Sequence, residues 1–109
     1  KSFTQSFSTR ILKPAVLLFP GQPATFHALI YSDNEWKTAP VAEDYNYHWY
    51  LIKTDDYGNK LAIKEIGSGP EVTIEVPENY KNHQLLLVTE TAEGFVTSTI
   101  SKLHTRGQE

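Results

Sequence analysis

The residues able to carry out chemistry are few and scattered in this sequence. No serine stands in a Gly-x-Ser-x-Gly turn, no glycine-rich phosphate loop is present, and no two histidines have the spacing of a helical metal site. Cysteine is absent, which removes thiolate nucleophiles and cysteine-bound zinc. The four histidines fall in four separate segments, as His27, His48, His83 and His104. We therefore expect no catalytic residue, no metal site, no cofactor and no enzymatic activity.

Two groups of side chains carry oxygen atoms of the kind that calcium prefers. Neither group has the spacing of a known calcium-binding loop, and a solvated acidic loop is the alternative interpretation of each. The first group lies between residues 33 and 44 and the second between residues 55 and 59; their members are Asp33, Asn34, Glu35, Glu43 and Asp44, and Asp55, Asp56 and Asn59.

Two aromatic residues, Trp36 and Tyr57, fall in segments that we expect to be loops. An exposed aromatic ring on a loop stacks well on a sugar ring or on a protein partner. The alternative for Trp36 is that its loop folds back and closes one end of the domain. Trp36 and Tyr57 are therefore the candidate residues of a glycan-binding site.

Composition limits the classes of partner. The chain has 109 residues and a formal net charge of −3, with acidic and basic residues interspersed, so it lacks the basic surface that nucleic acids require. No apolar run approaches the roughly 20 residues of a membrane span. Methionine is absent even from the first position, and we expect the chain to be one module of a larger protein.

The elements that position these residues are predicted to be β-strands. Turn residues alternate with β-rich runs throughout, and no window keeps a helical period, which indicates an all-β fold. A 13-residue polar loop is expected over residues 32–44. We expect residues 1–9 to be a linker or tail, 10–104 the domain and 105–109 a second tail. About seven antiparallel strands are predicted, over 10–19 with a bend at Pro14, 24–31, 45–53, 60–66, 71–76, 84–90 and 95–103.

Trp49 lies in the middle of the third predicted strand, in the segment Tyr47-His48-Trp49-Tyr50. A tryptophan there, with Ala28 in the second strand and Leu87 in the penultimate one, resembles an immunoglobulin-like β-sandwich of the cysteine-free kind found in phage tail and capsid proteins and bacterial surface proteins. The resemblance implies that Ala28 and Leu87 occupy the positions of the usual disulfide. The predicted core therefore includes Phe26, Ala28, Trp49 and Leu87.

The same resemblance implies a function. Such domains are non-enzymatic structural or adhesion modules on a virion or a bacterial cell surface, so we expect an extracellular location and a protein partner or neighbouring domain. A departure from the pattern is Leu85, which stands where a tyrosine corner would place its tyrosine. The rival function is that of a carbohydrate-binding module.

The outer face of one sheet is the more specific hypothesis. If Trp49 faces the core, alternation directs His48 and Tyr50 outward. If Val96 and Ile100 also face the core, the neighbouring strands add further apolar residues to that outer face. A one-residue shift of the 85–88 run, or cover by residues 60–66 or by the N-terminal segment, would remove the patch. The predicted contact residues are Tyr50, Ile52, Leu86, Val88 and Phe95.

Overall fold

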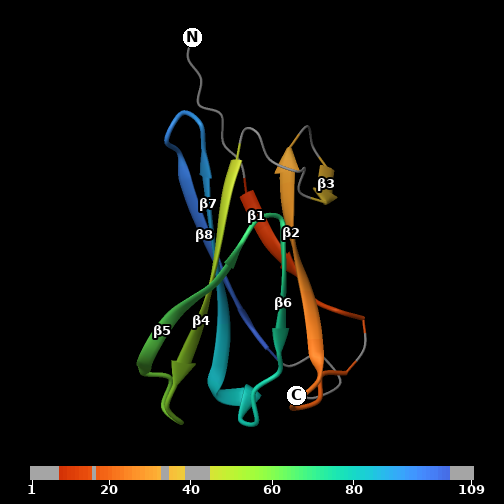
Figure 1. The fold of residues 1–109 in the computed structure, drawn as a ribbon. Helices are drawn as coiled ribbons and strands as arrows, with labels where there is room; N and C mark the ends of the chain where they lie inside the picture. Colours follow the sequence, from red (N-terminus) through yellow and green to blue (C-terminus); the bar gives the residue numbers. More distant parts are fainter. Residues whose placement is uncertain (1–7, 16, 33–34, 39–44, 104–109) are drawn as a thin grey trace.

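Eight β-strands and one short 3-10 helix make up the regular structure. The computed structural model describes residues 8–15, 17–32, 35–38 and 45–103, and for residues 32 and 35–38 it describes the backbone only. No α-helix occurs in this part of the chain. In chain order (Figure 1) the elements are β1 (Ser8–Leu12), β2 (Pro23–Ser32), β3 (Glu35–Thr38), β4 (Tyr45–Thr54), β5 (Lys60–Ser68), β6 (Glu71–Glu75), η1 (Tyr80–Asn82), β7 (His83–Thr91) and β8 (Val96–Lys102).

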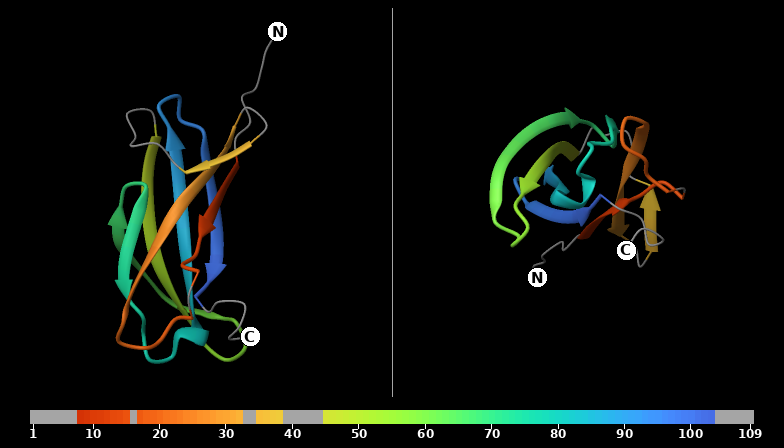
Figure 2. Two further views of the ribbon diagram at one scale, coloured as in Figure 1. Left: turned by 90° about the vertical axis from the view of Figure 1, so that its right-hand side faces the viewer. Right: turned by 90° about the horizontal axis from the view of Figure 1, so that it is seen from below.

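The strands form two antiparallel sheets. In the first, β2 pairs with β1, β3 and β6; in the second, the order is β5-β4-β7-β8. Figure 2 shows the two sheets from the side and from below, with β8 next to β1. The all-β fold predicted from the strand and turn pattern is confirmed.

Alternation along the strands explains which side chains enter the core. In β6, Val72 is buried and Ile74 half-buried, whereas the intervening Thr73 is exposed together with the two glutamates. Pleated strands direct successive side chains to opposite faces, so one apolar face of each sheet is buried against the other. The structure places all four predicted core residues there with no exposed surface: Phe26, Ala28, Trp49 and Leu87.

The N-terminal strand differs from the prediction. β1 begins at Ser8, inside the expected tail, and ends at Leu12, so the described residues of 13–19 contain no second half-strand. Leu12 pairs with His27, and continuing that register would place Pro14 opposite Thr25. Proline has no N–H to donate, which explains why the strand ends before it.

The strand count also differs, because the 13-residue loop between β2 and β4 contains β3. This four-residue strand pairs with the end of β2 and gives eight strands where about seven were predicted. Turn-forming polar residues surround it and conceal its strand character. The rest of that loop, residues 33–34 and 39–44, lies outside the described residues.

The chain crosses from one sheet to the other between β5 and β6. Gly69 has φ +101°, a left-handed conformation that favours glycine, and this residue turns the chain between the sheets. Just before it, Gly67 lies so close to Val72 that a Cβ atom on Gly67 would be 2.9 Å from the Val72 Cγ2 atom. The two sheets therefore approach each other closely here.

Candidate functional site

The outer face of the β5-β4-β7-β8 sheet carries a row of apolar side chains. Tyr50 of β4 pairs with Leu86 of β7, and Leu86 pairs with Ile100 of β8. Ile52 pairs with Ile63 of β5. Paired residues in an antiparallel ladder project on the same face. We call this surface the outer patch, and its members are Tyr50, Ile52, Ile63, Leu86, Val88 and Ile100.

Accessibility varies across the outer patch. Ile63 and Ile100 are 58% and 48% exposed, whereas Tyr50, Leu86 and Val88 are half-buried. Ile52 was predicted to be an accessible contact residue, but it is fully buried. It lies between Ile63 and Gln84 in the ladder, and these flanking side chains explain its burial. The accessible surface is therefore made by its neighbours.

The expectation that Val96 and Ile100 face the core is wrong. They pair with Glu90 and Leu86 on the outer face, and both are exposed. Phe95, predicted to join the patch, lies before β8 in the hairpin turn, where its N–H donates to the Thr91 hydroxyl at 3.1 Å. Because Phe95 and Val96 are both apolar, the sequence does not show which alternate residues of this strand face the core. The turn before β8 sets the register and so decides it.

Residues 60–66 and the N-terminal segment were named above as segments that would cover the outer patch, and neither does so within the described residues. Residues 60–66 belong to β5, which lies beside β4 within the same sheet. β1 belongs to the other sheet. The Leu85–Val88 run has the phase that the hypothesis required, with Leu85 and Leu87 fully buried.

Charged residues stand at the two margins of this face. Glu65 of β5 pairs with Tyr50 and lies 3.2 Å from His48, measured between carboxylate Oε2 and imidazole Nδ1. Lys102 of β8 pairs with Gln84 on the same face. The outer patch is thus an apolar strip with an acidic residue at one margin and a basic residue at the other.

The two candidate glycan-binding aromatic residues lie in different elements. Tyr57 is at the tip of the β4–β5 turn and is 91% exposed. Trp36 lies in β3 as the register partner of Tyr31, and its side chain is outside the described residues. The structure does not bring the two together in one described site.

The acidic residues of the β4–β5 turn are engaged in holding the turn. Asp55 Oδ1 accepts hydrogen bonds from the backbone N–H groups of Tyr57 and Asn59, and Oδ2 accepts one from the Asn59 amide. The Asn59 hydrogen bonds, side chain first, lower the pKa of Asp55. The Asn82 amide donates to Asp56 Oδ1 at 3.0 Å. The carboxylates of both Asp55 and Asp56 therefore accept hydrogen bonds.

Other candidate calcium ligands, Asp33, Asn34, Glu43 and Asp44, lie outside the described residues, and for Glu35 only the backbone is described. Among the residues that the structure describes, no group of three or more metal-binding side chains occurs.

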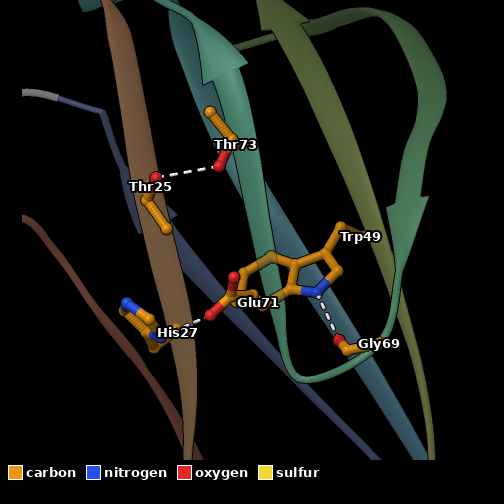
Figure 3. Close-up of polar contacts among 6 residues, drawn as sticks. All are labelled: Thr25, His27, Trp49, Gly69, Glu71 and Thr73. Carbon is orange, nitrogen blue, oxygen red and sulfur yellow. Dashed lines mark hydrogen bonds and ion pairs between the residues drawn. The ribbon is translucent and has the colours of Figure 1, made fainter.

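The histidines have separate partners. His27 lies 3.4 Å from Glu71 across the β2–β6 ladder (Figure 3), and His48 contacts Glu65 as above. His83 Nδ1 lies 3.0 Å from the Asn79 carbonyl oxygen, and His104 is outside the described residues. No two of the three described histidines are brought into a common site by these contacts.

Tyr47 is one of three described residues, with Thr9 and Thr89, that bury a side-chain oxygen without a hydrogen-bond partner. Its hydroxyl is buried and has no hydrogen-bond partner in the described structure. Burial, with the nearby Tyr45 as a smaller contribution, raises the pKa of Tyr47 to about 12. Neither effect was predictable from the sequence, because the groups that surround the Tyr47 hydroxyl come from other parts of the chain.

Two open pockets of about 370 and 360 Å³ also occur. The larger is apolar and lies at the start of β2, between Leu17, Phe19 and Pro23. The smaller lies where β4 begins, lined by Tyr45, His48 and the Gly69 turn. The described lining of the larger pocket has no titratable side chain, whereas the lining of the smaller one also includes Ser68, the register partner of His48.

Comparisons with protein-family models, with curated proteins and with solved structures find no match for this chain. In the described residues no helix is long and apolar enough to cross a membrane. Function is therefore inferred from the fold and its surface.

Proposed function

We propose that this chain is a non-enzymatic, immunoglobulin-like module that contacts another protein through the outer patch. The strand arrangement supports the family assignment. One sheet contains β1, β2, β3 and β6, and the other runs β5-β4-β7-β8. Trp49 on β4 is the register partner of Leu87 and belongs to the same core cluster as Ala28. Immunoglobulin-like sandwiches combine such sheets around a tryptophan on the third long strand.

The observation that carries the function is the row Tyr50–Leu86–Ile100, with Ile63 beside it, on the outside of the sheet. An exposed apolar patch rimmed by polar residues commonly marks a contact with another protein. Aromatic and large aliphatic side chains at the centre, with charged residues at the margin, are also the usual anatomy of a protein interface. A virion or a bacterial cell surface is the location we propose, following the family resemblance.

The contact is tested first with a second copy of the chain. Light scattering over a concentration series should give a mass above the 12.4 kDa monomer that rises with concentration. Replacing Tyr50 and Ile100 together by lysine should remove the part of that rise that comes from the outer patch, because both charges would be buried in the contact. Leu12→Lys is the matched control, since Leu12 is exposed on β1 of the other sheet.

A mass of 12.4 kDa at every concentration would exclude contact between copies through the outer patch. If Leu12→Lys loses as much association as the double variant, the loss comes from the change in net charge and not from the outer patch. Urea denaturation of each variant checks that it is folded.

The exposed Tyr57 supports glycan binding as a second candidate function. Under this proposal a glycan array should detect binding to the wild-type chain, and Tyr57→Ala should lose it while Tyr50→Lys retains it. An array without signal for the wild type would remove this candidate.

A further inference from the structure

β5 is the open edge of the second sheet. It pairs with β4 on one side and with no other described strand on the other. The opposite margin of the sheet, β8, lies beside β1. β5 is nine residues long, and residues 60–65 are all exposed. In Figure 1 it forms the left-hand margin of the molecule, away from β2 and β3.

An open edge presents a row of N–H and C=O groups that a further strand can use. Proteins commonly blunt such edges with proline, lysine or bulges. β5 contains no proline but has two register shifts against β4, at Leu61 and at Ile66. Leu61 and Ile63 on it are 59% and 58% exposed. Its two lysines, Lys60 and Lys64, do not prevent pairing outright. They restrict the register in which a like strand can pair.

We propose that β5 pairs antiparallel with β5 of a second copy of this chain, about a two-fold axis at Ile63. A two-fold axis between identical antiparallel strands sets one residue opposite itself. The register shifts leave Leu61 and Ile66 without a partner in β4, so the regular part of the edge runs from Ala62 to Glu65. Centring on Glu65 would set two glutamates opposite each other. The candidate centres are therefore Ala62, Ile63 and Lys64.

Charge distinguishes these three registers. Centring on Ala62 places Lys60 opposite the partner's Lys64, and does so twice. Centring on Lys64 places two lysines directly opposite each other. Like charges in directly opposed positions destabilise a strand pair.

Centring on Ile63 avoids both repulsions. Leu61 then pairs with Glu65 of the partner subunit, and Ala62 with Lys64 of the partner subunit. The two Ile63 side chains meet on the axis, where two exposed β-branched residues become neighbours. This is the register we infer.

The geometry has a consequence for the outer patch. A two-fold axis perpendicular to the sheet leaves the face of each copy unchanged, so the two four-stranded sheets would continue as one sheet of eight strands. Both outer patches would lie on the same side. The inference itself rests on the edge strand and its charges, and holds whether or not the outer patch binds a partner.

Disulfide trapping tests the proposal in the full chain, because the chain has no cysteine of its own. Ile63→Cys places two thiols across the axis, within the roughly 4.4–6.8 Å Cα separation that a disulfide spans. In a glutathione buffer at about 10 µM protein, paired strands hold the thiols at an effective concentration near millimolar, so covalent dimer should form at least about tenfold faster than by random collision.

Two single-cysteine controls define the baseline. Ala62→Cys is one position away on the same strand; in the inferred register its two copies stand about 8 Å apart, too far to bridge. Tyr57→Cys is highly exposed on a turn and reports random collision. Equal rates of cross-linking in the three cysteine variants would overturn the edge pairing. Faster cross-linking of Ala62→Cys than of Ile63→Cys would overturn the register.

A charge-swap experiment separates edge pairing from contact through the outer patch. Ile63→Lys and Ile63→Asp should each be monomeric, and an equimolar mixture should form a mixed dimer, because residue 63 meets its own copy on the axis. The Tyr50→Lys, Ile100→Lys variant should keep the fast cross-link when Ile63→Cys is added. Failure of the mixture to associate would contradict the axis at Ile63, and loss of the cross-link in the patch variant would assign the contact to the patch.

Discussion

The indole N–H of Trp49 donates a hydrogen bond of 2.9 Å to the carbonyl oxygen of Gly69 (Figure 3). Gly69 also donates from its own N–H to the Tyr47 carbonyl oxygen at 3.1 Å, and the next carbonyl, that of Pro70, accepts from the Ala28 N–H at 2.9 Å. The crossing between β5 and β6 is thereby tied to β4 of one sheet and β2 of the other. In a chain without cysteine, these bonds and the packing of Trp49 hold the sheets together.

Removing the Trp49 side chain should be severely destabilising. Trp49 is fully buried in the core, and Trp49→Ala is expected to lower the free energy of unfolding by about 3–5 kcal/mol. Trp49→Phe keeps most of the apolar contact but leaves the Gly69 carbonyl without its donor, at a cost of about 1–3 kcal/mol. Urea denaturation followed by circular dichroism measures both.

The contribution of the hydrogen bond is then separated from that of the packing. A Trp49→Phe variant as stable as the wild type would show that the Gly69 bond contributes little and that ring packing alone joins the sheets. A loss below about 1 kcal/mol in Trp49→Ala would contradict the central place of Trp49 in the core.

Gly67→Ala should destabilise the domain through a steric clash. The added Cβ would be 2.9 Å from Val72 Cγ2, closer than side-chain carbons approach, so the sheets must shift. Overpacking of this kind costs about 1–3 kcal/mol. Adding Val72→Ala removes the clashing methyl group. The double variant should therefore lose less free energy of unfolding than the two single variants lose in sum. Strict additivity would show that the clash is relieved elsewhere.

Tyr47→Phe should stabilise the domain by about 1 kcal/mol at neutral pH, because it removes a buried hydroxyl without a described hydrogen-bond partner. The pKa of Tyr47 rises from 10.0 to about 12 in the folded chain. The folded state therefore keeps a proton that the unfolded state loses between these pH values, and the wild type should lose about 1.4 kcal/mol per pH unit there.

Urea denaturation at pH 9 and at pH 11 checks this dependence. The advantage of Tyr47→Phe over the wild type should grow between the two pH values, because only the wild type carries the Tyr47 hydroxyl. A constant difference would show that the Tyr47 hydroxyl ionises as readily in the folded chain as in the unfolded one.

Asp55→Ala should weaken the β4–β5 hairpin at neutral pH. The charged carboxylate accepts three hydrogen bonds within the turn, and its lowered pKa means that folding favours the ionised form. Its stabilising contribution is present above the ordinary pKa of an aspartate and is lost as the pH falls through the lowered pKa. The difference in urea midpoint between the wild type and Asp55→Ala should therefore be larger at pH 7 than at pH 2.

Glu93→Ala, in the exposed turn between β7 and β8, is the matched control for loss of an acidic side chain. It measures what the loss of an acidic side chain from an exposed turn does to stability at each pH. An Asp55→Ala variant with the same deficit at both pH values would attribute the effect to the turn geometry alone.

Local patterns in the sequence were sufficient to predict the class of fold and much of the core. The strand predicted over residues 71–76 corresponds to β6, and the gap between the predicted strands 45–53 and 60–66 contains the β4–β5 turn. Trp49 was assigned to the interior from its place in a strand, and it is fully buried. These features depend on neighbouring residues, which the sequence displays directly.

Tertiary structure alone decided the phase of β8, the burial of Ile52 and the presence of β3. The turn ahead of β8 sets its register, and adjacent apolar residues such as Phe95 and Val96 fit either phase. Burial of Ile52 depends on Ile63 and Gln84, which come from strands on either side of it. The Trp49–Gly69 bond likewise joins residues 20 positions apart, and no local pattern records which carbonyl a distant turn will present to an indole.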